Sequence, residues 1–246
     1  MTTRIVLTAE HGGNKVPAKY RSLFENAGEV LATHRGWDPG SLELAKLFAR
    51  RLKASLVAAQ VTRLLVDLNR KASNRSVFSE FTRPLDREAR QAILDRYHTP
   101  HRSRVESTVR SLIDAGHDVV HIGMHSFTPE LHGEVRNADI AFLYDPSRSG
   151  ERSLCLAWKK ALQAARPDLR VRMNYPYLGT SDGLTTTLRR VLPPESYVGF
   201  EVEVNQLWPQ SRLEAWPGLL ASLFDTFTTA SAAYGQDVSQ GSGRSG

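Results

Sequence analysis

Residues 119–129 read Val-Val-His-Ile-Gly-Met-His-Ser-Phe-Thr-Pro, an apolar run that gives way to polar residues at His125. A second run, Arg-Ile-Val-Leu-Thr-Ala at 4–9, ends in the same way, and Glu-His-Gly-Gly-Asn follows it at 10–14. Nearly continuous apolar runs are typical of strands buried in a parallel sheet. Ligands of such sheets collect at the carboxyl ends of the strands. The sequence therefore predicts that His11 and His125, far apart in the chain, meet at one edge of a sheet.

Two imidazoles delivered to one sheet edge are typical of a metal site. A third strand-like run, Tyr-Val-Gly-Phe-Glu-Val-Glu-Val-Asn at 197–205, places Glu201, Glu203 and Asn205 on one face, because side chains alternate along a strand. Carboxylates in a core strand are costly unless they are paired or bound to a metal. Two histidines and a glutamate together supply what a zinc hydrolase needs, namely ligands for the ion and a base for its water.

Strand-like and helix-like segments alternate along the chain. We expect strands at 4–9, 56–60, 63–67, 118–124, 138–144, 169–173 and 197–205, and helices at 17–27, 39–53, 86–116 (bent near Pro100), 150–165 and 215–228. This alternation predicts an α/β fold, with a mostly parallel or mixed central sheet and helices on both of its faces. We expect a single catalytic domain over residues 1–229. The tail, 230–246, is rich in Ser, Gly, Gln and Ala, which predicts disorder.

The composition narrows the class of protein. The chain has 246 residues, 41% of them hydrophobic, which is enough for one sizeable core. Its only cysteine, Cys155, excludes an intramolecular disulfide and a cysteine-based zinc site. We expect a cytoplasmic protein without membrane contact, since no signal peptide or long apolar stretch is apparent. The net charge of +6 is spread without a block of like charges, which favours an anionic small substrate over nucleic acid.

A zinc site with three protein ligands needs one more donor beside the two histidines. Asp38, in Gly-Trp-Asp-Pro-Gly, is the preferred candidate, with an ordinary helix N-cap as the alternative role. Asn14 is a weaker candidate because a neutral amide is a poor zinc ligand. His121 lies four residues before His125 on the same strand face, about 13 Å deeper. It is expected to be a satisfied core histidine or a residue that supports the metal ligands, rather than a ligand itself.

Three further residues are candidates for binding the substrate's anionic group. Asn69 and Arg70 follow a strand-like segment, and a guanidinium is a planar, bidentate partner for a carboxylate. Arg189, at the end of a long polar loop, is a second cationic candidate. Arg63 would be separated from Asn69 and Arg70 by most of a strand, so a structural role is expected for it.

Eight segments, taken in order, resemble the N-formylglutamate amidohydrolase family over residues 4–210. They are Glu-His-Gly-Gly-Asn-Lys-Val-Pro (10–17), Gly-Trp-Asp-Pro-Gly-Ser (36–41), Arg-Leu-Leu-Val-Asp-Leu-Asn-Arg (63–70), Tyr-His-Thr-Pro-His-Arg (97–102), His-Ser-Phe-Thr-Pro (125–129), Arg-Asn-Ala-Asp-Ile (136–140), Asn-Tyr-Pro-Tyr-Leu-Gly (174–179) and Glu-Val-Glu-Val-Asn-Gln (201–206). More distantly, the chain resembles the zinc carboxypeptidases and the succinylglutamate desuccinylases. The resemblance implies a zinc-carboxypeptidase-like (phosphorylase/hydrolase-like) fold.

By the same resemblance, His11 and His125 bind Zn²⁺, Asn69 and Arg70 bind a carboxylate, and Glu203 is the catalytic base. Glu201 shares the face of Glu203 and is either a supporting group or a competing base. One position departs from the carboxypeptidase pattern. Asn14 stands where those families have a glutamate ligand, and Asp38 is our replacement.

The implied activity is zinc-dependent cleavage of the amide bond of an N-acyl (formyl-type) amino acid such as N-formylglutamate. The alternatives are a carboxypeptidase-like peptidase acting on a short peptide with a carboxylate, and a non-enzymatic ligand-binding module on a degenerate hydrolase scaffold.

Overall fold

The computed structural model describes residues 2–241, with side chains up to Tyr234. Six strands form the central sheet in the order β2-β1-β3-β8-β6-β7. Their bounds are β1 (Thr3–Ala9), β2 (Ser55–Ala58), β3 (Asp118–Phe127), β6 (Ile140–Leu143), β7 (Val171–Met173) and β8 (Tyr197–Asn205). β1, β2, β3 and β8 are parallel, whereas β6 is antiparallel to β8. The sheet is therefore mixed, as predicted. A short hairpin, β4 (Glu130–Leu131) and β5 (Glu134–Val135), extends beyond β3.

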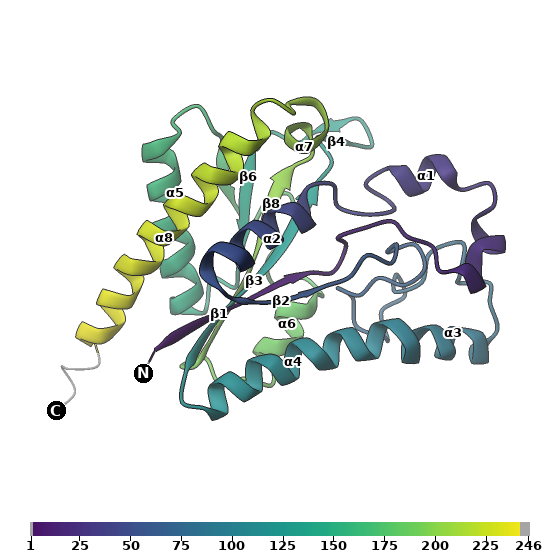
Figure 1. Ribbon diagram of the computed structural model, residues 1–246, viewed down its shortest axis with the longest axis horizontal. Coiled ribbons are helices and arrows are strands. Elements are labelled where there is room, and N and C mark those ends of the chain that lie inside the picture. Colours follow the sequence, from purple (N-terminus) through teal and green to yellow (C-terminus); the bar gives the residue numbers. More distant parts are fainter. Residues whose placement is uncertain (1, 242–246) are drawn as a thin grey trace.

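Helices cover both faces of the sheet, which confirms the α/β fold (Figure 1). The strands alternate, so that neighbouring residues contribute to different cores. Val120, Ile122 and Met124 of β3 pack with α2 (Ser41–Leu52), α5 (Ser149–Ala165) and α8 (Trp216–Gly241), and these elements share one continuous core. Val119 of the same strand belongs to a second core with α4 (Thr99–Asp114) and α6 (Leu184–Arg189). No described helix is both long enough and apolar enough to cross a bilayer.

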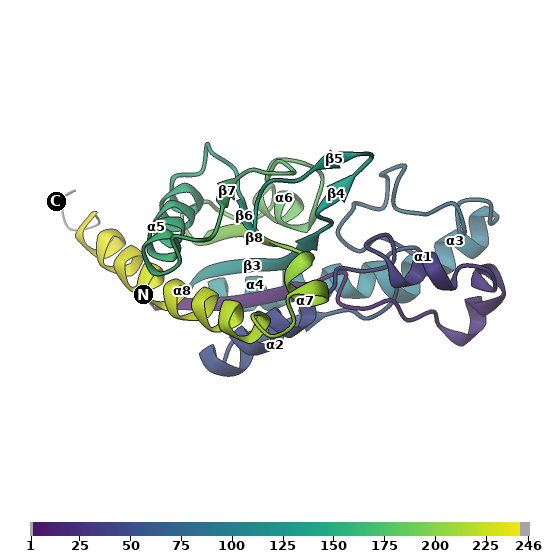
Figure 2. The same ribbon diagram turned by 90° about the horizontal axis from the view of Figure 1, so that it is seen from above.

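The expected strand at 63–67 is wrong, because this segment forms turns. Its apolar side chains, Leu64, Leu65 and Val66, pack outside the sheet in a separate cluster with Phe24 and Ile93. This cluster lies in the part of the molecule that carries α1 (Gly28–Ala32) and α3 (Arg87–Ile93), which extends away from α8 (Figure 2). A buried apolar run resembles a strand in sequence whichever core it enters.

The predicted helices differ from the structure mainly at their ends. The 17–27 segment forms the 3-10 helix η1 (Ala18–Phe24), and α2 begins at Ser41 rather than at 39. The 86–116 helix is divided by a π-helical turn, η2 (Leu94–His98), just before Pro100, which has no N–H to donate back to the preceding turn. The short helix α7 (Leu207–Ser211) precedes α8.

Helix α8 continues to Gly241, so the expected disorder of 230–246 is wrong for residues 230–241. Ala230 is buried in the main core and Tyr234 packs against that core. These contacts bury apolar surface that the mostly polar composition of the segment did not predict. The rest of the expected tail, 242–246, lies outside the described residues.

Candidate metal centre and substrate pocket

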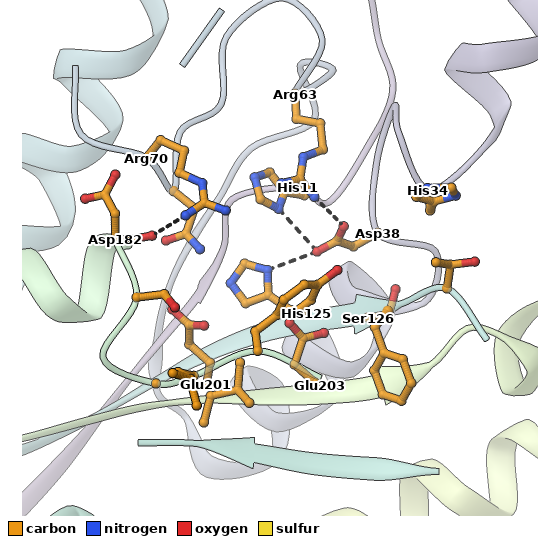
Figure 3. Close-up of a pocket in the computed structure, with 18 residues that line it drawn as sticks. His11, His34, Asp38, Arg63, Arg70, His125, Ser126, Asp182, Glu201 and Glu203 are labelled. Atoms are coloured by element: carbon orange, nitrogen blue, oxygen red, sulfur yellow. Dashed lines mark hydrogen bonds and ion pairs between the residues drawn. The ribbon is translucent and has the colours of Figure 1, made fainter. Parts of the chain in front are cut away.

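The carboxyl ends of β1, β3 and β8 meet at one pocket, as the sequence predicts (Figure 3). His125 of β3 lies opposite Glu203 of β8 in the parallel register, so both side chains project from the same face. His11 follows the end of β1 by two residues, and the turn that contains Asp38 returns to it, since Asp38 N donates to His11 O (2.9 Å). All four residues line the pocket.

His11, Asp38 and His125 come together as a compact set of buried donors. Asp38 Oδ2 lies 3.2 Å from His11 Nδ1 and 2.9 Å from His125 Nδ1. One donor atom from each residue lies within 4.8 Å of the others. Asp38 is not the N-cap of α2, a position taken by Gly40. Asn14, the weaker candidate, turns away from these donors and donates to Leu31 O.

The far nitrogens of both imidazoles face two further carboxylates. His11 Nε2 lies 2.7 Å from Asp67 Oδ1, and His125 Nε2 lies 3.1 Å from Glu10 Oε2. Histidines that bind metals usually direct their other ring N–H at a carboxylate or carbonyl, which fixes the tautomer and the ring orientation. With Nε2 protonated in both rings, the two Nδ1 lone pairs and the Asp38 carboxylate would point at one another. Three atoms that point lone pairs at one another in this way require a cation between them. The two imidazoles and the Asp38 carboxylate are therefore suited to binding a metal ion.

The pKa values follow from these contacts. Burial alone would lower the pKa of His125, but the carboxylates of Asp38 and Glu10 outweigh it and hold the pKa well above its ordinary value. Burial and Arg63 would lower the pKa of His11, but Asp67 and Asp38 outweigh them, so the pKa of His11 is also raised. The site is therefore built to hold positive charge.

Glu10, Asp67 and Arg63 are site residues that the sequence analysis missed. Arg63 bridges two carboxylates, with Nη1 3.2 Å from Asp38 Oδ1 and Nη2 2.8 Å from Asp67 Oδ2. Its expected separation from Asn69 and Arg70 by most of a strand is wrong, because 63–67 forms turns and all three residues line the same pocket. A usable signal was present for the carboxylates, since Glu10 and Asp67 each follow an apolar run and cannot stay buried without partners.

Glu203 is 5% exposed, and its Oε2 has no hydrogen-bond partner among the described side chains and backbone. Burial raises the pKa of Glu203 to about 8, although His125 acts in the opposite direction. A buried carboxyl group whose pKa lies near neutrality is suited to moving protons. Glu201, two residues earlier, also lines the pocket, and its Oε1 accepts a hydrogen bond from Thr185 Oγ1 (3.0 Å).

Asn69 and Arg70 also line the pocket. Arg70 Nη1 donates to the carbonyl oxygen of Asp182 (2.7 Å). The guanidinium has no carboxylate partner among residues 2–234. Arg102 of α4 holds this segment in place, since its Nη1 lies 2.9–3.3 Å from the carbonyl oxygens of residues 68–70. Both candidate carboxylate-binding residues are therefore positioned before any ligand arrives.

Arg189 does not line the pocket, so its expected contact with the substrate is wrong. Its guanidinium is buried, with Nε donating to Glu151 Oε1 (2.8 Å) and Nη2 to Gly199 O (2.6 Å). The sequence analysis placed this segment in a loop, whereas α6 directs Arg189 toward the fully buried Glu151, which needs a charged partner.

The comparisons with known proteins identify the family of the chain. The model of the N-formylglutamate amidohydrolase family matches residues 3–208. The chain belongs to this family. It is therefore a hydrolase that acts on amides. No curated protein matches the sequence.

Two solved structures share the fold of this amidohydrolase. A gene product of Agrobacterium tumefaciens is 28% identical, with a TM-score of 0.77 over 93% of this chain and 90% of that one. An N-formylglutamate amidohydrolase from Ralstonia eutropha JMP134 is 17% identical, with a TM-score of 0.70 over 94% of both chains.

The pocket of the amidohydrolase is small and polar. Its volume is about 180 Å³, below the roughly 300–1,000 Å³ of pockets for drug-sized ligands. The expectation that the long loop after β7 has a function is supported by position, since Tyr177, Leu178 and Asp182 of this loop line the pocket. His34 and Ser126 also line it, and neither carries a sequence signal that sets it apart from a surface residue.

Proposed function

We propose that this amidohydrolase is zinc-dependent and cleaves the amide bond of a small N-acyl amino acid of the N-formylglutamate type. One observation carries the proposal. His11 and His125 both turn Nδ1 toward Asp38 Oδ2 and Nε2 toward a second carboxylate, which is the arrangement of metal-binding histidines.

His11, Asp38 and His125 would hold the ion and leave a position open toward the pocket. A bound zinc ion acidifies water and polarises a carbonyl oxygen. The chain's own residues supply the remaining chemistry. Glu203 takes a proton from the attacking water at its partner-free Oε2 and delivers it to the leaving nitrogen. A cation at the neighbouring donors favours the ionised form of Glu203, which this role requires.

Glu203 is a better base than Glu201 on position. Glu203 lies directly opposite His125 in the sheet register, whereas Glu201 lies opposite Gly123. The partner-free oxygen of Glu203 is free to bind water, while Glu201 is held by Thr185.

Arg70 and Asn69 would bind the carboxylate of the substrate. The Arg70 guanidinium has no carboxylate partner in the described chain, whereas Arg63 already faces Asp38 and Asp67. A guanidinium and an amide together provide the N–H donors that a carboxylate accepts. The small volume of the pocket favours a single amino-acid derivative over a longer peptide.

Elemental analysis of the purified protein, followed by an assay with N-formylglutamate, tests the proposal. We expect about one zinc ion per chain, lost in His11→Ala, Asp38→Ala and His125→Ala. Glu203→Gln is the matched control, since it should retain zinc and lose turnover. A wild-type protein that binds no zinc after zinc is supplied, or a Glu203→Gln variant with wild-type turnover, would contradict the mechanism.

A further inference from the structure

The pocket contains two charged side chains of opposite sign that do not neutralise each other. Neither Glu201 nor Arg70 takes part in an ion pair in the described part of the chain. The polar contact of Glu201 is with the Thr185 hydroxyl, and that of Arg70 is with the carbonyl oxygen of Asp182. Both line the same pocket, together with Glu203, Asp182 and the ion-paired Asp38 and Arg63. Its occupant therefore meets an acid at Glu201 and a cation at Arg70 that are not paired with each other.

Glu201 lies between the proposed reaction centre and the carboxylate-binding residues. On β8 it precedes Glu203 by two residues, about 6–7 Å along the same face of the strand. On its other side it approaches Asn69 around Gly183, where an added Cβ would lie 3.3 Å from Glu201 Oε1 and 3.2 Å from Asn69 Oδ1. The order along the pocket is therefore Glu203, Glu201, then Asn69 with Arg70 (Figure 3).

An N-acyl amino acid presents its groups in the same order. The carbonyl under attack is followed by the amide nitrogen, and the α-carbon with its carboxylate comes next. With the carbonyl beside Glu203 and the carboxylate on Arg70 and Asn69, the amide N–H faces Glu201. An ionised carboxylate is a strong acceptor for such a donor.

We propose that Glu201 accepts a hydrogen bond from the N–H of the scissile amide and, after cleavage, from the ammonium group of the amino-acid product. This inference rests on the proposed function and adds that Glu201 recognises the amide nitrogen of the substrate. Hydrolysis breaks the C–N bond, places the water oxygen on the acyl carbon and leaves both water protons on the nitrogen. The product is therefore an ammonium that pairs with Glu201 and a carboxylate that pairs with Arg70.

Calorimetric titration of the zinc-loaded protein with two ligands tests this role. L-Glutamate carries the product's ammonium and carboxylates, and glutarate carries the carboxylates alone. We expect the wild type to bind L-glutamate at least about tenfold more tightly than glutarate, the value of a charge-assisted hydrogen bond. Glu201→Gln should weaken L-glutamate binding by a similar factor and leave glutarate binding unchanged or tighter. Asp168→Asn, the same kind of change at an acid that does not line the pocket, should alter L-glutamate binding less than threefold.

Three results would overturn the inference. Equal affinities of the wild type for the two ligands would exclude a contact with the ammonium, and this comparison needs no variant to fold. An equal loss for both ligands in Glu201→Gln would indicate a general disturbance of the pocket. Failure of both ligands to bind the wild type would instead contradict the proposed function as well, because Arg70 and Asn69 would then bind no carboxylate.

Discussion

His121 and His125 stand four residues apart on the same face of β3, yet their surroundings are opposite. His121 is fully buried between two neutral hydroxyl groups, with Nε2 2.9 Å from Thr8 Oγ1 and Nδ1 2.8 Å from Tyr197 OH. His125 is almost as buried, but it lies among carboxylates, with Asp38 at Nδ1 and Glu10 at Nε2. One strand therefore carries a histidine in the core and another at the proposed metal centre.

The two histidines differ in the charge that their surroundings favour. Burial lowers the pKa of His121 to about 4, so this ring stays neutral. The carboxylates around His125 hold its pKa well above the ordinary value despite burial. Burial alone thus does not identify a functional histidine. The neighbouring acids do, because they favour a proton or a metal ion at the imidazole.

The largest expected effect is a loss of zinc binding and activity when His125 is removed, and His121 should not share it. His125→Ala should abolish zinc binding and reduce kcat/KM by about a thousandfold or more, since the reaction centre loses a ligand. His121→Ala should keep about one zinc per chain and near-wild-type activity in its folded fraction, while losing about 2–4 kcal/mol of stability. Zinc analysis, steady-state kinetics and urea unfolding of the two variants measure this. Loss of zinc in both would show that the comparison is wrong.

Acid unfolding tests the neutral state of His121. Its pKa is about 4 in the folded protein against 6.5 for an ordinary histidine, so the folded state binds fewer protons. The lowered pKa of His121 therefore contributes to the free energy of unfolding in full above pH 6.5, and this contribution is lost as the pH falls toward 4. It amounts to roughly 3 kcal/mol, from 1.36 kcal/mol per pKa unit. The difference in unfolding free energy between the wild type and His121→Gln should shrink by this amount on acidification, and a constant difference would contradict it.

The sequence predicted the elements whose apolar patterns extend along whole strands or helices. β1, β3 and β8 were predictable because each is an apolar run that ends in polar residues. The segment 63–67 was not, because Leu64, Leu65 and Val66 enter a separate cluster and their pattern does not reveal which core they join. The helical continuation of α8 past residue 229 was missed because the buried Ala230 lies among small and polar residues that predict disorder.

The candidate site was predictable where a residue lies at or just beyond the carboxyl end of a strand, as His125 and His11 do. Arg63 and Arg189 show why the rest was not. Each arginine stands at one end of a predicted segment, and only the turn at 63–67 and the helix α6 determine which of them faces the pocket. Arg63 pairs with Asp38, 25 residues away, and Arg189 with Glu151, 38 residues away, so these pairings are a property of the tertiary structure.

A smaller effect is expected when the proposed metal centre keeps both histidines and loses one of the surrounding acids. Asp67→Asn removes the charge that faces His11 Nε2 and retains the shape of the side chain. Zinc affinity should fall about ten- to hundredfold, as is usual for a carboxylate that supports a metal-binding histidine. Competition with a chelator measures the affinity. The control Asp168→Asn removes an acid from an exposed ion pair far from the pocket and should change nothing. Unchanged affinity in Asp67→Asn would show that Asp67 serves to hold Arg63 and the Asn69 backbone rather than to support the metal ligand.

The smallest expected effect lies at the amino end of β3. Tyr197→Phe removes the hydroxyl that bonds His121 Nδ1 and leaves one buried nitrogen without its partner. This should cost about 1–2 kcal/mol of unfolding free energy, and Thr8→Val, which affects the other nitrogen, should cost a similar amount. Because neither change touches the carboxylates around His125, kcat/KM should stay within about twofold of the wild type. A tenfold loss in either variant would mean that the core histidine positions the proposed metal ligand along the strand, and the two ends of β3 would then act as one unit.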